Sequence, residues 1–140
     1  MIKKTMTYTD YNGVERKEDF YFHLNKSELS KMELTAQGGY AEMIQKIINA
    51  KDIPAIIQVM EDLIQKSYGV KTPDGRGFLK RKEDLELFMA TEAYSDLFME
   101  LSTDEDKAAE FINGVIPADL AEEVAKQQKQ GNFSIAPKNN

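Results

Sequence analysis

Residues 2–24, IKKTMTYTDYNGVERKEDFYFHL, decide how the chain begins to fold. The first residues alternate between apolar and polar, and a second run ends in Phe20-Tyr21-Phe22, aromatic residues that favour strands. Asp10-Tyr11-Asn12-Gly13 lies between the two runs and has the composition of a turn. The stretch therefore predicts an N-terminal antiparallel β-hairpin.

The alternation of side chains selects the register of this hairpin. A two-residue Asn12-Gly13 loop would place Met6 opposite Asp19. A three-residue loop that includes Tyr11 instead pairs Ile2 with Phe22, Lys4 with Phe20 and Tyr8 with Arg16. We expect this second register, with Gly13 as a left-handed G1 bulge, because it collects the apolar residues on one face. Since an isolated hairpin is only marginally stable in water, that face should pack on the rest of the chain.

Helical patterns follow the hairpin. Asn25 and Glu28 have the spacing of a capping box before a short helix near 26–34. The clearest apolar stripe runs from Ile53 to Tyr68, and Gly69 is expected to be the C′ residue of that helix. The other expected helices lie near 40–48, from about Lys82, after a Thr91 cap, after a cap at Ser102 or Thr103, and from Pro117 to about Lys126. Asp52 is the expected cap of the helix that contains Pro54.

Together these patterns predict an α+β fold, in which the hairpin packs on a bundle of about five or six short helices. Pro73-Asp74-Gly75, with short extended pieces on both sides, leaves a second small hairpin open between Val70 and Lys80. Residues 1–126 are expected to form a single domain. The polar residues 127–140 are expected to form a flexible tail.

Composition excludes several classes of protein. The chain has no cysteine, which excludes disulfides, iron–sulfur clusters, thiol nucleophiles and Cys-based zinc sites. No apolar run approaches the roughly 18 residues that span a bilayer, and the first residues show no secretory signal. Eighteen Lys and Arg against 24 Asp and Glu give a net charge of −6, which opposes binding to nucleic acid. We predict a soluble intracellular domain with no membrane or nucleic-acid partner.

No group of residues has the spacing of an active site. His23 is the only histidine, and its place in an alternating strand is typical of a surface or half-buried residue. Asp104, Glu105 and Asp106 could surround a magnesium ion, but acids at a helix start are typically there to offset the helix dipole. Residues 69–77 are glycine-rich but lack the spacing of a phosphate loop. We predict no catalytic residue, no cofactor and no metal site.

Two sets of residues are weak candidates for contact with a protein partner. The basic candidates are Arg76, Lys80 and Arg81, followed by Lys82, which could form a patch for an acidic protein surface. The apolar candidates are Phe133 and Ile135, which lie in the polar C-terminal segment and could dock on another chain. Methionines in the helical stripes, such as Met60, could also contact a partner, although core filling is the simpler explanation.

Five stretches carry a likeness to a known family. They are residues 3–16 (KKTMTYTDYNGVER), 18–24 (EDFYFHL), 69–78 (GVKTPDGRGF), 91–95 (TEAYS) and 111–117 (FINGVIP). Over about residues 1–126, this pattern resembles the small tail assembly chaperones of long-tailed bacteriophages and related prophages.

The resemblance implies a non-catalytic protein that assists tail building in the host cytoplasm and is absent from the mature virion. Its implied partners are the tape measure protein, which it keeps soluble, the tail tube protein that it helps to recruit, and further copies of itself. An acidic helical protein could cover the apolar stripes of a tape measure protein and remain soluble. The alternatives are a structural tail or head-completion protein and, more remotely, a small enzyme.

The resemblance also implies a longer form made by translational frameshifting. Pro137-Lys138-Asn139 can be encoded as CCA-AAA-AAC, which contains the slippery run A-AAA-AAC. We therefore expect this run in the coding DNA, followed by an overlapping open frame.

Overall fold

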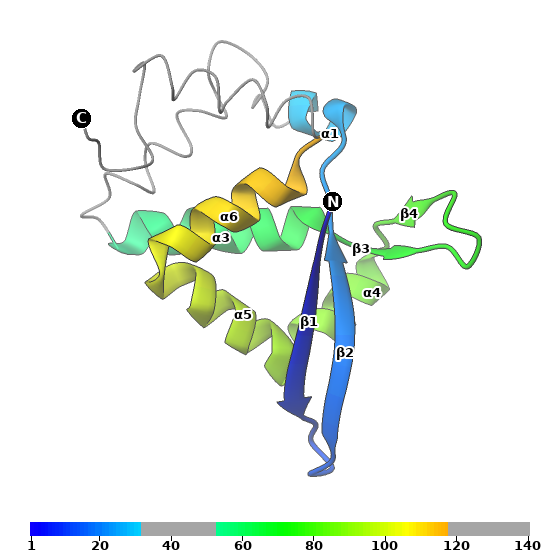
Figure 1. Cartoon of the computed structure of the whole chain (residues 1–140), viewed down its shortest axis with the longest axis vertical. Helices are drawn as coiled ribbons and strands as arrows, with labels where there is room; N and C mark the ends of the chain where they lie inside the picture. Colours follow the sequence, from blue (N-terminus) through cyan, green and yellow to red (C-terminus); the bar gives the residue numbers. More distant parts are fainter. Residues whose placement is uncertain (32–52, 118–140) are drawn as a thin grey trace.

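A computed structural model describes residues 1–31 and 53–117 of the chain (Figure 1). Within this part, four strands form one antiparallel sheet in the order β1 (Ile2–Thr9), β2 (Glu15–Phe22), β3 (Tyr68–Lys71) and β4 (Phe78–Leu79). The five described helices are α1 (Lys26–Lys31), α3 (Ile53–Ser67), α4 (Lys82–Met89), α5 (Glu92–Thr103) and α6 (Glu105–Val115). The predicted α+β class with an N-terminal hairpin is confirmed, and the sheet includes the second hairpin that the sequence left open.

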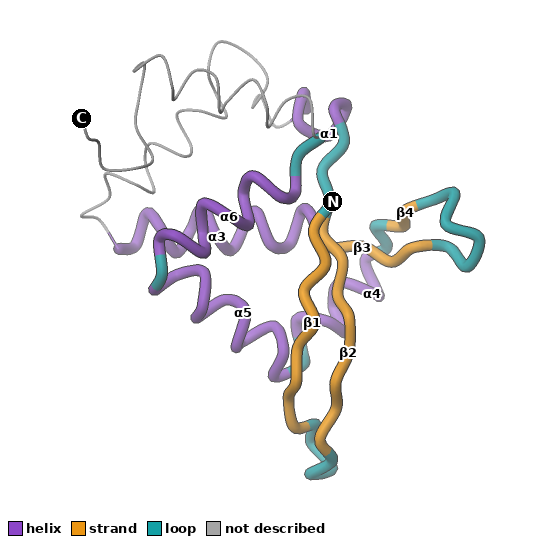
Figure 2. The backbone as a smooth tube through the Cα atoms, viewed as in Figure 1, coloured by secondary structure: helices purple, strands orange, loops and turns teal. Residues whose placement is uncertain are grey.

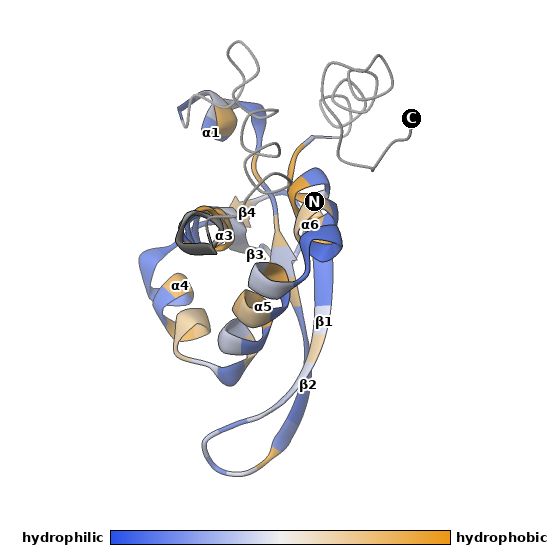
Figure 3. Ribbon diagram, turned by 90° about the vertical axis from the view of Figure 1, so that its left-hand side faces the viewer, coloured by the Kyte–Doolittle hydropathy of each residue, from blue (hydrophilic) through white to orange (hydrophobic). Residues whose placement is uncertain are grey.

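The helices lie on one side of the long β1–β2 arm. Figure 3 shows α3, α4 and α5 on one side of this arm, and the tip of the arm reaches beyond the helices. The residues of β1 on the opposite face, Lys3, Thr5 and Thr7, are exposed to solvent. The shorter β3–β4 hairpin projects sideways from the helices, as the backbone trace in Figure 2 shows.

The β1–β2 hairpin has the register that the alternation predicts. Ile2 pairs with Phe22, Lys4 with Phe20 and Tyr8 with Arg16. Gly13 has a φ of 80°, and its N–H donates to the carbonyl of Asp10 at 2.9 Å. Because only glycine adopts this left-handed conformation at little cost, the predicted G1 bulge is confirmed.

Aromatic side chains join the sheet to the helices. Phe22 is fully buried, and its ring centroid lies 5.2 Å from that of Phe111 on α6 and 5.8 Å from that of Phe88 on α4. The apolar stripe of α6, which consists of Ala108, Phe111, Ile112 and Val115, is buried in the same core. Burial of each large side chain of this kind stabilises the fold by about 2 kcal/mol.

The predicted end of the longest helix is wrong. α3 ends at Ser67, and Tyr68 begins β3 instead of closing the helical stripe. Gly69 is therefore not a C′ residue; it pairs with Tyr21 of β2. A Cβ at Gly69 would lie 2.6 Å from Cε2 of the Phe78 side chain, so the glycine allows the close approach of β4. The helix stops early because the unpaired edge of β2 offers hydrogen-bond partners to the next segment.

The cap predicted for α6 also differs. Ser102 and Thr103 belong to α5, and the Thr103 hydroxyl donates to the carbonyl of Met99 at 2.7 Å. The carboxylate of Asp104 caps α6 instead, and it accepts from the amides of Asp106 at 3.0 Å and Lys107 at 3.2 Å. An Asp side chain reaches these amides, whereas the threonine hydroxyl is already engaged inside the preceding helix.

Two other predicted caps, at Asn25 and at Thr91, are confirmed. The amide of Asn25 donates to Glu28 Oε1 at 2.9 Å, and the amide of Glu28 donates to Asn25 Oδ1 at the same distance, which is a capping box. The Thr91 hydroxyl accepts from the amide of Tyr94 at 3.3 Å and caps α5.

Several predictions fall outside the described residues. They are the helix near 40–48, the Asp52 cap, the helix beyond Pro117, the boundary at residue 126, the tail 127–140 and the codons of residues 137–139. Over residues 1–31 and 53–117, none of the helices has the length and the apolar character needed to cross a membrane.

Candidate partner-binding site

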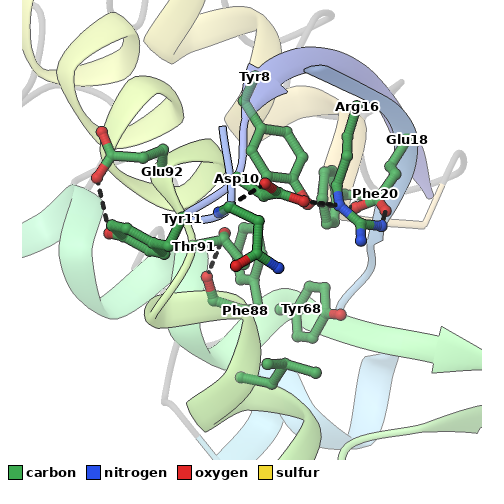
Figure 4. Close-up of a pocket in the computed structure, with 12 residues that line it drawn as sticks. Tyr8, Asp10, Tyr11, Arg16, Glu18, Phe20, Tyr68, Phe88, Thr91 and Glu92 are labelled. Atoms are coloured by element: carbon green, nitrogen blue, oxygen red, sulfur yellow. Dashed lines mark hydrogen bonds and ion pairs between the residues drawn. The ribbon is translucent and has the colours of Figure 1, made fainter. Parts of the chain in front are cut away.

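A hollow of about 470 Å³ lies between the distal half of the β1–β2 hairpin and the corner where α4 meets α5 (Figure 4). Its floor is aromatic and consists of Phe20, Tyr68 and Phe88. The rings of Tyr68 and Phe88 are stacked with centroids 4.3 Å apart, and the Phe20 centroid lies 5.0 Å from that of Phe88. We call this hollow, with its aromatic floor and with Tyr11 and Leu87 at its mouth, the hairpin groove.

A charged network from the hairpin forms one rim of the groove. Nε of Arg16 lies 2.7 Å from Asp10 Oδ2, and a terminal nitrogen of Arg16 lies 3.2 Å from Glu18 Oε2. The hydroxyl of Tyr8 donates to Glu18 Oε1 at 2.6 Å. Together with burial, this hydrogen bond raises the pKa of Tyr8 to about 12. The hydrogen bonds from Arg16 and from the amide of Val14 lower the pKa of Asp10, which favours the ionised form of this carboxylate beside Arg16.

The mouth of the groove is formed by two exposed apolar side chains. Tyr11 at the hairpin tip is 77% exposed, and Leu87 on α4 is 70% exposed. The Tyr11 hydroxyl donates to Glu92 Oε2 at 2.8 Å, and this hydrogen bond raises the pKa of Tyr11. This bond ties the hairpin tip to the first turn of α5 (Figure 4).

The arrangement suits binding of apolar side chains. The three carboxylates of the groove are hydrogen-bonded to its own residues: Asp10 and Glu18 to Arg16, and Glu92 to Tyr11. Among the residues that the structure describes, no three acidic or histidine side chains are grouped to hold a metal ion. An aromatic floor with tyrosine and arginine at the rim is the composition that protein interfaces favour.

The basic candidates occupy three different environments. Lys80 Nζ donates to the carbonyl of His23 at 2.7 Å, to the carbonyl of Lys66 at 2.9 Å and to Glu28 Oε2 at 2.7 Å. Lys80 thus joins the end of β2, the end of α3 and α1. Arg81 pairs through Nε with Asp84 at 2.7 Å, which raises the pKa of Arg81.

Arg76, the third basic candidate, lies in the β3–β4 turn, where its amide donates to Asp74 Oδ1 at 3.1 Å. The structure brings Lys80, Arg81 and Lys82 together at a second hollow, whose lining residues do not include Arg76. Phe133 and Ile135 fall outside the described residues.

His23 is half-buried, as its position in the alternating strand predicts. Its ring packs edge-on against Phe78 with centroids 6.4 Å apart. Burial, followed by the positive charges of the N-terminus and Lys80, lowers the pKa of His23.

A comparison with models of protein families matches the whole chain, residues 1–140, to the family described as phage tail assembly chaperone. The chain belongs to this family. The resemblance seen in five stretches of the sequence is therefore confirmed, and the match extends beyond the 126 residues over which it was apparent. Searches of the curated proteins and of the solved structures each found no significant match.

Sequence patterns did not indicate the groove of this chaperone. Its floor combines Phe20 with Tyr68 and Phe88, which lie far apart in the sequence. One local signal was present. Leu87 is an apolar residue that lies outside the apolar stripe of its helix, which Leu85 and Phe88 define, so it is expected to face solvent. Met60 is fully buried, so core filling accounts for that methionine.

Proposed function

We propose that this chaperone binds the tape measure protein, keeps it soluble during tail assembly and helps to recruit tail tube protein. It works by reversible binding, transforms no substrate, and acts in the host cytoplasm without entering the virion. The observation that carries the proposal is the hairpin groove, an apolar hollow with two exposed apolar side chains at its mouth.

An amphipathic helix binds a groove by inserting apolar side chains that recur every three or four residues. The hairpin groove, at about 470 Å³, has room for one or two such side chains above Phe20, Tyr68 and Phe88. Removing one leucine from water at this floor contributes about 2 kcal/mol. The charged network of Arg16 remains at the edge, where it stays hydrated and favours a helix with polar flanks.

A single groove of this size supports only weak binding, so we propose that many copies act together. Several copies on one long helix, held by contacts among themselves, would bind with much greater avidity than one copy. The net charge of −6 on each copy would keep such a complex in solution.

The proposal is tested by co-expressing the chain with its tape measure protein and measuring how much of the latter is soluble. Leu87→Glu places a charge at the mouth of the groove, and Met99→Glu is the matched control on α5, outside the groove. Both side chains are more than half exposed, at 70% and 54%, so neither change removes a buried contact. We expect the wild type and Met99→Glu to keep the tape measure protein soluble, and Leu87→Glu to lower its recovery several-fold.

If the wild-type chain leaves the solubility of the tape measure protein unchanged, the proposed function is wrong. If the wild type is active and the two variants behave alike, the chaperone binds through another surface and the groove is not the site. Circular dichroism of each variant checks that the fold is intact.

A further inference from the structure

A second hollow, of about 400 Å³, lies between α1, the end of α3 and the beginning of α4. Its apolar part is formed by Leu24, Tyr68 and Leu85, and of these Tyr68 and Leu85 remain partly exposed. The two hollows have only Tyr68 in common among their lining residues. A ligand bound in the second hollow would therefore contact a largely separate surface.

The side chains around this hollow are mostly positive, whereas the net charge of the molecule is negative. Its lining includes five cationic side chains, Lys31, Lys66, Lys80, Arg81 and Lys82, and one carboxylate, Glu28. The chain as a whole carries a net charge of −6. We call this hollow, defined by its apolar part and its five cations, the basic hollow.

The five cations are not equally available. Lys80 uses its ammonium group in three internal hydrogen bonds, and Arg81 pairs with Asp84. Lys82 lies 4.0 Å from Glu86, with both side chains highly exposed, so this pair is weak. Lys31 and Lys66 form no ion pair with any residue in the described part of the chain.

We infer that the basic hollow binds an acidic protein segment that carries one large apolar side chain flanked by Asp or Glu. The apolar side chain would enter the space above Tyr68 and Leu85. The flanking carboxylates would pair with Lys31 and Lys66, which form no ion pair within the described chain, and with Lys82, whose pair with Glu86 is weak. This contact is separate from tape measure binding at the hairpin groove.

Two features favour a protein segment over nucleic acid. The cations surround a compact hollow, whereas binding to a nucleic acid requires a basic track along which several phosphates can lie. The acidic remainder of the molecule would also repel a long polyanion, while a short peptide needs to meet only the local positive field.

The test uses the full chain and fluorescein-labelled peptides in a fluorescence anisotropy titration. The first peptide has a central phenylalanine flanked by glutamates, and the second has glutamine in place of each glutamate. The variant Lys66→Gln/Lys82→Gln neutralises the hollow and leaves Lys80 in place. The control Lys3→Gln/Lys17→Gln removes the same charge from two exposed strand positions. Oligo-dT is the competing polyanion.

We expect the glutamate peptide to bind at least tenfold more tightly than the glutamine peptide, and more weakly as salt is added. Lys66→Gln/Lys82→Gln should weaken binding about fivefold, since each exposed ion pair contributes modestly. The control variant should bind within about twofold of the wild type.

Several results would overturn the inference. They are equal binding of the two peptides, no binding of the glutamate peptide at about 1 mM, equal losses in the two variants, or tighter binding of oligo-dT. Sedimentation without peptide tests another occupant: self-association that Lys66→Gln/Lys82→Gln abolishes would assign the hollow to a second copy. These readouts do not involve the tape measure protein, so failure here leaves the proposed function standing.

Discussion

The hydroxyl of Tyr8 connects the buried face of β1 to the charged rim of the hairpin groove. Tyr8 is only 9% exposed, and its hydroxyl donates to the Glu18 carboxylate, which also pairs with Arg16. The carboxylate accepts the hydrogen bond only while Tyr8 is protonated. The protonated hydroxyl of Tyr8 therefore stabilises both the pairing of β1 with β2 and the charged rim of the groove.

This coupling predicts a loss of stability at high pH. The folded-state pKa of Tyr8 is raised to about 12, above the value of about 10 for an unfolded chain. A raised folded pKa stabilises the fold fully below about pH 10, and the contribution is lost as the pH rises to about 12. Tyr8→Phe should cost about 1 kcal/mol near neutral pH and flatten this decline.

The measurement is the urea midpoint of unfolding across this pH range. Tyr21→Phe, which leaves the hydrogen bond between Tyr8 and Glu18 in place, is the control. If the urea midpoint of Tyr8→Phe fell with rising pH as steeply as that of the wild type, the Tyr8 hydroxyl would not be the source of the loss of stability.

Among the secondary-structure elements, α6 packs very closely against the start of β1. A Cβ built on Gly114 of α6 would lie 2.9 Å from both Cβ and Cδ1 of Ile2. The amide of Leu24 donates to the carbonyl of Val115 at 2.7 Å, which holds the end of α6 beside the end of β2. Glycine is unfavourable inside a helix by about 1 kcal/mol relative to alanine, so its presence here reflects the packing.

Gly114→Ala should therefore destabilise the fold by about 1–2 kcal/mol, although helix propensity alone favours alanine. The added methyl group would overlap Ile2, whose Cβ cannot move without shifting the strand. In Ile2→Gly/Gly114→Ala the cost of the glycine change at residue 114 should shrink, because Ile2→Gly removes both the Cβ and the Cδ1 that the new methyl group would overlap. The urea unfolding free energies of the wild type, both single variants and the double variant measure this coupling. Stabilisation by Gly114→Ala alone would contradict the packing argument.

An element could be predicted when the residues that determine it lie close together in the sequence. The register of β1–β2 follows from the alternation of its residues and a turn only a few residues long, so it could be predicted. The boundary between α3 and β3 could not. Tyr68 continues the apolar stripe of the helix. An inward-facing tyrosine that stacks on Phe88 is equally compatible with a strand. Only the unpaired edge of β2 determines which structure forms.

At the scale of the molecule, two of the hollows in the described part of the chain differ in character, and both lie on a protein of net negative charge. The hairpin groove has an aromatic floor and an ion-paired rim, and the basic hollow has an excess of positive charge. The binding that we propose at each hollow would be reversible, because a contact confined to a hollow of this size buries far less area than a stable interface requires. Reversible association is what an assembly chaperone needs if it is to leave the finished tail.

Purified virions of the phage that encodes this chain should therefore contain no detectable copies of it. Quantitative mass spectrometry would measure the chain in infected cells and in purified particles, with the tail tube protein as the positive control. The chain should be abundant in cells and absent from particles. Stoichiometric retention in the virion would instead support a structural tail component.

The sequence alone was enough to determine the α+β class, the hairpin register, the capping box and the family of this chaperone. Each depends on neighbouring residues or on a pattern spread over the whole chain. Tertiary structure alone decided the two hollows that we propose as binding surfaces, because contacts between distant segments create them. Adjacent basic residues looked like one patch, yet Lys80 became an internal tie among three elements and Arg76 lies apart in a projecting turn. Charge and hydropathy are properties of residues, but availability for a partner depends on what the fold places beside them.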